Sequence, residues 1–226
     1  MLTLILAESA LELIPESLTS YQVIASSAKK RNKKTREILL DSSYHYSAMK
    51  NLEDADRRGR PDIIHIFLLN ALESIANKQG KMQIIIHTRN NEKITIDSST
   101  RIIKNYERFI GLIEQLFQKQ ILPDEKNPLL KLEKNKDLQT IVKEIKSDFT
   151  IGLSIEGKQV KMLNYFKDLK KKNHEHIACI VGGFPKGDFN NDIKKLTDQI
   201  VSIYPEMLTA WTVTNEIIVN YENVYL

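Results

Sequence analysis

The 226-residue sequence predicts an α/β fold with a mainly parallel sheet flanked by helices. Two observations lead to this prediction. Short apolar runs of strand length alternate with longer segments whose apolar residues recur at helical spacing. One of these runs, residues 82–87, is apolar at nearly every position, as expected for a strand that is covered on both faces. With 42% hydrophobic and 27% charged residues, the chain can bury a core, and we expect a single domain over residues 1–226.

The first part of the chain is expected to contain a strand and two helices, with a polar insertion between the helices. Residues 2–7 read as a buried strand, and residues 8–18 read as a helix after it. Residues 26–60 are polar and irregular, and we interpret them as a basic elaboration on the core. Pro61 suits the first position of a helix, in which apolar residues recur on one face as far as Ile75.

The alternation of strands and helices continues to the end of the chain. Residues 93–97 alternate in polarity and are expected to pair with the preceding strand as a hairpin. The next helix is expected to have Thr100 as its cap. The remaining predicted elements are, in order, a helix over residues 101–120, a loop at Pro123 and Pro128, a helix over 131–146, a strand over 149–155, a helix over 159–172, a strand over 176–181, a polar helix around 191–199, a strand over 200–204 and a helix over 206–221.

Composition narrows the expected location of the protein. Cys179 is the single cysteine, so an internal disulfide is excluded, and its apolar surroundings are typical of a buried side chain in a reducing compartment. No apolar run approaches the roughly 20 residues that a membrane span requires. Residues 2–7 are too short for the apolar region of a signal peptide. We therefore expect a cytoplasmic, soluble protein without a membrane partner.

Basic residues concentrate at two places, although the formal net charge is only +4. Six basic residues and no acid occupy residues 28–36, which is typical of a solvated loop, with nucleic-acid contact as the alternative. In the predicted helix that follows the hairpin, Arg101, Lys104 and Arg108 lie nearly opposite the apolar face, and Lys119 extends the line. A solvated face normally mixes signs more evenly, so this stripe is a candidate for contacts with phosphates.

The strongest local signal is a glycine-rich loop near the C-terminus. Residues 180–189 lead from an apolar strand into three glycines and Pro185, so the backbone there can approach a ligand closely. A second irregular loop at residues 202–205 and a turn at residues 153–157 are expected to share one pocket with it. Dinucleotide-binding enzymes carry their glycine loop after the first strand, so the late position disfavours a nicotinamide oxidoreductase.

Arg60 and Asp62 flank the proline at the start of the predicted helix and are candidates for chemistry. The structural alternative is that Asp62 complements the helix N-terminus and pairs with an arginine. His174 and His176 are two residues apart, but no third ligand is in view, so we expect no metal site. The sequence contains no Walker loop, Cys-x-x-Cys pair or Ser-His-Asp order.

Several motifs together resemble those of one known family. The motifs are Arg60-Pro-Asp-Ile-Ile-His65, Ile86-His-Thr88, Thr100-Arg-Ile-x-x-x-Tyr-x-Arg-Phe-x-Gly-Leu112, Gly182-Gly-Phe-Pro-x-Gly187 and Tyr204-Pro205. In this order they are similar to the compact, archaeal-type small-subunit ribosomal RNA pseudouridine N1-methyltransferases of the SPOUT (α/β-knot) superfamily. The resemblance covers nearly the whole chain and is least clear from residue 28 to residue 52.

The resemblance implies a fold, a cofactor and partners. The fold is a SPOUT-type α/β knot with a trefoil-knotted C-terminal half, and the cofactor is S-adenosyl-L-methionine, held between the knot loops. The partners are small-subunit ribosomal RNA, a second copy of the chain in a homodimer, and possible contact with a small-subunit ribosomal protein. The implied cofactor contacts are Leu153, Gly182, Gly187, Val201, Ser202, Ile203, Tyr204, Pro205 and Glu206. The implied RNA contacts are Arg60, Asp62, Arg101, Lys104 and Arg108.

The implied activity is N1-methylation of a pseudouridine during biogenesis of the small ribosomal subunit. Asp62 would accept the proton of the ring nitrogen or orient the base, and Arg60 would hold the nucleotide. The family usually has arginine where Lys104 stands, and lysine keeps the charge but loses bidentate geometry toward phosphate. An alternative from another class is a non-catalytic rRNA-binding assembly factor, or RNA chaperone, that uses the same basic surface.

Overall fold

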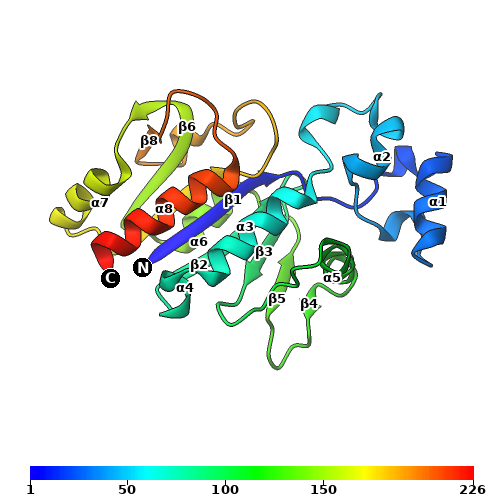
Figure 1. Cartoon of the computed structure of the whole chain (residues 1–226), viewed down its shortest axis with the longest axis horizontal. Helices are drawn as coiled ribbons and strands as arrows, with labels where there is room; N and C mark the ends of the chain where they lie inside the picture. Colours follow the sequence, from blue (N-terminus) through cyan, green and yellow to red (C-terminus); the bar gives the residue numbers. More distant parts are fainter.

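The computed structural model describes residues 1–226. An eight-stranded sheet in the order β4-β5-β3-β2-β1-β7-β6-β8 forms its centre (Figure 1). The strands are β1 (Leu2–Ser9), β2 (Met82–Thr88), β3 (Lys93–Ile96), β4 (Ile121–Leu122), β5 (Leu130–Glu133), β6 (Phe149–Gln159), β7 (Ile177–Gly182) and β8 (Gln199–Ser202). The central strands pair in parallel, and β3, β5 and β4 continue the sheet in antiparallel fashion from β2. The predicted α/β class with a mainly parallel sheet is confirmed.

Helices cover both faces of this sheet. Their bounds are α1 (Gln22–Lys30), α2 (Ser42–Met49), α3 (Pro61–Glu73), α4 (Ile75–Lys78), α5 (Tyr106–Lys119), α6 (Leu138–Ile145), α7 (Met162–Lys171) and α8 (Ala210–Tyr225). On the face turned to the viewer in Figure 1, α8 packs between α3 and α7. No helix combines the length and the apolar composition that crossing a membrane demands.

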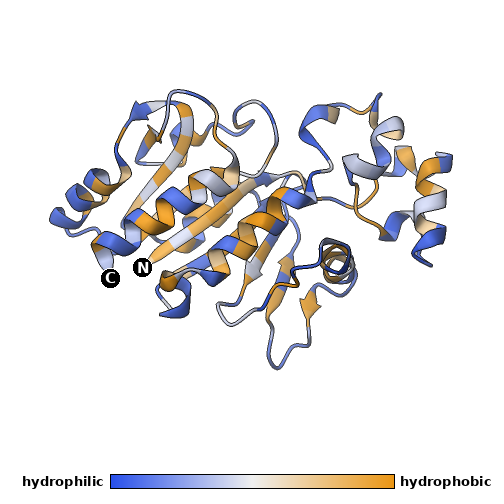
Figure 2. Cartoon of the chain, viewed as in Figure 1, coloured by the Kyte–Doolittle hydropathy of each residue, from blue (hydrophilic) through white to orange (hydrophobic).

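Strand β1 shows how the core is divided between the two faces. Its side chains alternate in direction, so Leu4 and Leu6 join the main core under α3 and α8. Ile5 points the other way and packs with Ile180 and with Leu138 of α6. Figure 2 shows the hydrophobic colouring concentrated on the central strands and on α3. Because the sheet is buried on both faces, its strand ends are fixed points from which loops can be positioned.

The segment between β1 and α3 forms a smaller lobe around α1 and α2, at the right of Figure 1. Eight buried residues make its own apolar cluster: Ile14, Leu18, Ile24, Ala28, Ile38, Leu40, Ala48 and Met49. The basic run at residues 28–36 is not simply a solvated loop. Arg31 and Lys33 each donate to the buried carboxylate of Glu114 on α5 at 2.7 Å, and the Leu39 N–H donates to it at 3.0 Å. Two of the six basic residues therefore fasten the lobe to the core.

The predicted helix over residues 8–18 is wrong. Only the 3-10 turn η1 (Glu16–Leu18) is helical there, and Glu8 has a left-handed φ of 51°. Glu8 and Glu12 are buried, and their carboxylates bind arginines that lie more than 40 residues further along the chain. These long-range ion pairs fix the backbone after β1 more strongly than helix propensity does.

The predicted helix over residues 101–120 is confirmed only from Tyr106 onward. Its N-cap is Asn105, whose side chain accepts a hydrogen bond from the Arg108 N–H at 3.0 Å. Thr100 is not the cap, because its hydroxyl donates to the carbonyl of Leu129 at 3.1 Å. Residues 101–105 consequently lie outside the helix, in the segment that leads into it.

Three later predictions also need correction. Residues 131–146 are not one helix, because Leu130 and Leu132 are buried while Lys131 is exposed, and this alternation belongs to β5 beside β3. Asp137 then caps α6. The polar helix around residues 191–199 is reduced to the short turn η4 (Ile193–Lys195). The last helix begins at Ala210 instead of residue 206, which leaves a longer loop after β8.

Candidate active site

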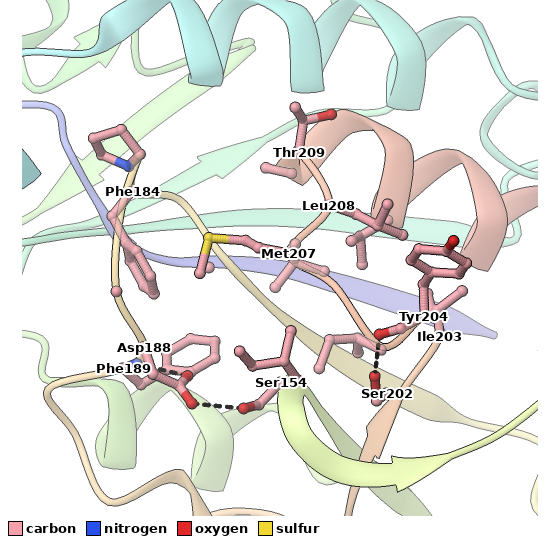
Figure 3. A pocket seen from close by; sticks show the side chains of 18 of the residues that line it. Ser154, Phe184, Asp188, Phe189, Ser202, Ile203, Tyr204, Met207, Leu208 and Thr209 are labelled. Atoms are coloured by element: carbon pink, nitrogen blue, oxygen red, sulfur yellow. Dashed lines mark hydrogen bonds between the residues drawn. The ribbon is translucent and has the colours of Figure 1, made fainter.

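A cleft of about 360 Å³ lies beside the middle of β6, where β7 and β8 end and α8 begins. Three segments from different parts of the sequence line most of it: residues 153–155 of β6, residues 181–189 after β7, and residues 201–213 from β8 into α8. Figure 3 shows side chains of these segments converging on the cleft. Most lining residues are hydrophobic, so the cleft is suited to a flat, partly apolar ligand that is recognised through exposed main chain.

Most cofactor residues predicted from the sequence meet in this cleft. The predicted residues that line it are Leu153, Gly182, Gly187, Val201, Ser202, Ile203, Tyr204 and Glu206. Pro205 is the exception, since it does not line the cleft. Arg60 and Ile63 also line the cleft, whereas Asp62 does not. Whether the lining residues contact a cofactor stays a prediction.

Hydrogen bonds hold the three loops in place. The Ser154 hydroxyl on β6 donates to the carboxylate of Asp188 at 2.6 Å and so links two of the segments (Figure 3). The Ser202 hydroxyl donates to the carbonyl of Tyr204 at 2.7 Å, which closes the turn after β8. Gly157 permits the close approach of β6 to β8, because a Cβ there would lie 2.6 Å from the Val201 backbone. Any larger residue at position 157 would therefore force β6 and β8 apart at this crossing.

Glu8, Arg57 and Phe184 form what we call the loop clamp. The Glu8 carboxylate accepts hydrogen bonds from Arg57 at 3.0 Å, from the Asn190 N–H at 2.9 Å and from the Asn191 N–H at 2.7 Å. The Arg57 guanidinium lies 4.0 Å from the centre of the Phe184 ring. It also donates to the carbonyls of residues 186 and 188, so one arginine binds the glycine loop from two sides.

Arg60 and Asp62 form a bidentate ion pair at the rim of the cleft. Nε and Nη2 of Arg60 donate to the two carboxylate oxygens at 2.8 and 2.7 Å, and both side chains are about one-third exposed, at 33% and 37%. This hydrogen bonding raises the pKa of Arg60 above its usual value, against the opposing effect of burial. The structural interpretation of Asp62, as an acid in the first turn of α3 that pairs with an arginine, is therefore confirmed. A catalytic role for Asp62 stays a prediction.

Tyr106 and His65 link the elements that carry the Arg60–Asp62 pair. Tyr106 donates to the carboxylate of Asp41 at 2.6 Å, and burial, followed by this hydrogen bond, raises the pKa of Tyr106 far above its usual value. His65 bonds to the Ile103 carbonyl at 2.8 Å and stacks on Phe109 with ring centres 4.4 Å apart. These contacts join α3, α5 and the smaller lobe, so the rim is built on three elements.

The three basic residues of the predicted stripe are placed differently from the prediction. Arg108 lies in the first turn of α5, whereas Arg101 and Lys104 lie in the preceding segment, so the three do not form one helical face. All three side chains are exposed and none makes an ion pair. They nevertheless remain available to phosphates. No group of three His, Cys, Asp or Glu side chains is placed to hold a metal ion.

Sequence analysis missed several residues that build the cleft. Phe184 and Asp188 lie within the glycine-rich motif and could have been selected by their position in it. Most of residues 207–213 line the cleft because α8 begins at Ala210. The apolar pattern of this segment did not indicate that late start. The roles of Glu8 and Arg57 were not foreseen, because each depends on a contact between distant segments.

A mainly parallel sheet of this order, with a cleft beside its C-terminal strands, is the fold and site of an α/β-knot methyltransferase. The sequence model of the family described as EMG1/NEP1 methyltransferase matches residues 4–222. The chain belongs to this family.

Several known proteins are similar to the chain over almost its full length. A protein of Methanothrix thermoacetophila named ribosomal RNA small subunit methyltransferase Nep1 is 47% identical over 223 residues, covering 99% of this chain and 96% of the relative. The protein of that name from Thermococcus onnurineus is 48% identical and covers 99% of both chains. The crystal structure of Archaeoglobus fulgidus Nep1 bound to S-adenosylhomocysteine superimposes with a TM-score of 0.86 at 30% identity, covering 98% of this chain and 97% of that one.

Proposed function

We propose that this chain transfers a methyl group from S-adenosyl-L-methionine to N1 of a pseudouridine in small-subunit ribosomal RNA, and so acts in biogenesis of the small ribosomal subunit. One observation carries the proposal: segments from β6, β7 and β8 converge on a cleft that Arg60 also lines, and Arg60 is paired with Asp62. The names of the relatives, and the S-adenosylhomocysteine bound to the Archaeoglobus protein, support this assignment.

The cleft fits S-adenosylmethionine by its chemistry. Leu153, Ile155 and Leu208 offer apolar walls for an adenine ring, and the irregular backbone after Ser202 offers N–H and C=O groups for its polar edge. Gly187 has a φ of 80°, and a Cβ there would lie 2.9 Å from the Arg57 guanidinium, so a larger residue would push the loop off its clamp. When bound, this cofactor supplies an electrophilic methyl group.

Arg60 and Asp62 are proposed to act on the target nucleotide. Asp62 accepts the proton that N1 releases as the new carbon–nitrogen bond forms, because N1 is protonated at neutral pH. Arg60 orients that carboxylate through its bidentate contact and presents its remaining donors to the nucleotide. A positioned general base accelerates such a step by about 10²–10⁴-fold. Asp62 does not line the cleft, so this role requires its side chain to turn from Arg60 toward the base.

RNA is proposed to approach over the rim that carries the free basic residues. Arg101, Lys104 and Arg108 have no competing acidic partner and can neutralise phosphates. The target base has to leave its stack to reach the cleft, so a single-stranded loop is the favoured substrate. Replacing all three by glutamine should lower the salt dependence by about 2 log units per log salt, at roughly 0.7 for each phosphate contact on single-stranded RNA.

The decisive experiment measures transfer of a tritiated methyl group to two short rRNA hairpins that differ only in having pseudouridine or uridine at the target position. We expect labelling of the pseudouridine hairpin alone, because uridine has no free N1 in its ring. Equal labelling of both hairpins would contradict the proposed specificity. Titration calorimetry with S-adenosylmethionine separates the enzyme from the alternative, since a non-catalytic assembly factor does not require binding of this cofactor.

We propose further that the chain works as a homodimer, as the resemblance implies. Tyr204 and Met207 on the loop before α8, and Val219 on α8, are exposed large apolar side chains that a second copy would cover. Light scattering of the purified chain should give about twice the monomer mass of 26.1 kDa. A small-subunit ribosomal protein as a further partner, and a cytoplasmic location, stay predictions.

A further inference from the structure

A second cleft lies beside the first, on the side of the smaller lobe. It has a volume of about 410 Å³ and runs between α2, the segment before α3 and the tip of the glycine loop. Arg60 and Pro185 line both clefts, so they form the partition between them. Nothing in the proposed methyl transfer uses the second cleft.

The side chains of this cleft are suited to a nucleotide. Tyr46 on α2 is 70% exposed and its hydroxyl makes no hydrogen bond, so its ring is free to stack. Lys50 is exposed and makes no ion pair. The other charges are already matched: Arg58 binds Glu12, Asp56 binds Lys186, and Arg60 binds Asp62. The cleft therefore offers one free aromatic face and one free positive charge.

An exposed tyrosine and an exposed lysine are common on protein surfaces and by themselves indicate nothing. Here they line one cleft that adjoins the proposed target site through Arg60. RNA continues on both sides of a target base held at Arg60, so a neighbouring nucleotide can reach the second cleft across that partition. Single-stranded RNA is recognised mainly by stacking of splayed bases on aromatic side chains and by basic contacts to phosphate. The second cleft provides both.

We infer that the second cleft is a binding subsite for the nucleotide directly next to the methylated one in the RNA chain. Its base stacks on the ring of Tyr46, and its phosphate contacts Lys50. This inference rests on the proposed function for the identity of the RNA. In this arrangement the target nucleotide and its neighbour are held on either side of Arg60. Tyr46 would then favour single-stranded RNA, because only an unstacked base can reach its ring.

Equilibrium binding of a labelled hairpin tests the subsite, with the full chain and saturating S-adenosylhomocysteine. Tyr46→Ala should weaken RNA binding about tenfold, as loss of one base–aromatic stack does, and Tyr46→Phe should restore it. Lys50→Gln should lower the salt dependence by about 0.7 log units per log salt. The matched controls are Tyr21→Ala and Lys30→Ala, because both residues are exposed in the same lobe and line neither cleft.

A double-mutant cycle makes the test specific. Hairpins with an abasic site immediately 5′ or 3′ of the target are compared for the unsubstituted chain and for Tyr46→Ala. At one of the two positions the abasic site should weaken binding to the unsubstituted chain about tenfold and have no further effect on Tyr46→Ala. Independent, multiplying losses at both positions would overturn the subsite, and so would equal losses in the Tyr21→Ala control.

The outcome stays separate from the outcome for the proposed function. Binding is measured without methyl transfer, so coupling between Tyr46 and a flanking base, in a chain that does not methylate, would support the subsite and refute the reaction. Methylation of the pseudouridine hairpin without that coupling would refute the subsite alone. Failure of the hairpin to bind the unsubstituted chain would refute both. Melting temperatures of the variants confirm that each is folded, which is expected for exposed positions.

Discussion

Replacing Arg57 by lysine should weaken cofactor binding while the protein stays folded. Arg57 is 13% exposed, and it contacts Glu8, the Phe184 ring and two carbonyls of the glycine loop at once. Lysine keeps the positive charge and can bind Glu8, but it cannot reach the carbonyls and cover the ring at the same time. The substitution therefore loosens the glycine loop without leaving a buried carboxylate unpaired.

The size of the effect follows from the contacts that are lost. One charge-assisted hydrogen bond and one cation–π contact together contribute about 2 kcal/mol at a site of this burial. If all of this is lost from the ordered loop, the dissociation constant for S-adenosylhomocysteine rises about 30-fold, since 1.4 kcal/mol corresponds to a factor of ten. Titration calorimetry measures it directly, and thermal melting checks that the variant is folded.

Arg58 provides a matched control for this prediction. It is 12% exposed and binds the buried Glu12 through two hydrogen bonds, whereas Arg57 binds Glu8 through one, and it makes no hydrogen bond to the glycine loop. Arg58→Lys should therefore cost a similar amount of stability and leave the affinity for S-adenosylhomocysteine within about twofold. Equal affinities for the two variants, whether both reduced or both unchanged, would refute the reasoning.

Three further predictions concern the chemistry, the lobe and acid stability. Asp62→Asn should lower turnover on the pseudouridine hairpin by about 10²–10⁴-fold, with RNA binding largely kept; near-normal turnover would remove Asp62 from the chemistry. Glu114→Gln should lower the free energy of urea unfolding by about 3 kcal/mol, because it leaves two half-buried cations without their buried partner; a loss below 1 kcal/mol would contradict a fastening role. Burial lowers the pKa of His87, whose Nδ1 accepts from the Glu8 N–H, so the unfolded chain takes up a proton more readily than the folded one. The contribution of neutral His87 to stability is present above about pH 6.5 and is lost as the pH falls through the folded pKa. The free energy of urea unfolding should therefore fall less between pH 7 and pH 5 for His87→Gln than for the unsubstituted chain.

The elements that could be predicted from the sequence are those whose pattern has one interpretation. A strand that is apolar at most positions on both of its faces, such as residues 82–87, is expected to be buried on both faces, and Pro61 at the first position of α3 fixes where that helix begins. The same holds for the glycine-rich loop, because a loop after a buried strand in a parallel sheet lies at the edge where clefts form.

The elements that could not be predicted are those whose pattern fits two structures. The pattern of residues 131–146 predicts one helix with Leu132 and Leu138 on its buried face, and only the pairing of Leu132 with Ile94 of β3 shows that Leu132 belongs to a strand. The basic run at residues 28–36 likewise has the composition of a solvated loop. Two of its cations, Arg31 and Lys33, instead bind the buried carboxylate of Glu114. No local pattern in the sequence could identify that partner, which lies 81 residues beyond Lys33.

The consecutive arginines Arg57 and Arg58 explain how the smaller lobe comes to serve the cleft. Arg57 binds Glu8 near the end of β1 and Arg58 binds Glu12 just after that strand, so the segment before α3 is fastened to the end of the central sheet at two points. Buried ion pairs contribute little net stability, because desolvation offsets most of their attraction, but they do impose one geometry. That geometry places Arg57 against the glycine loop and Arg60 between the two clefts. A shift of this segment would move the glycine loop and Arg60 together, so we predict that the proposed binding of cofactor and of RNA both depend on Glu8 and Glu12.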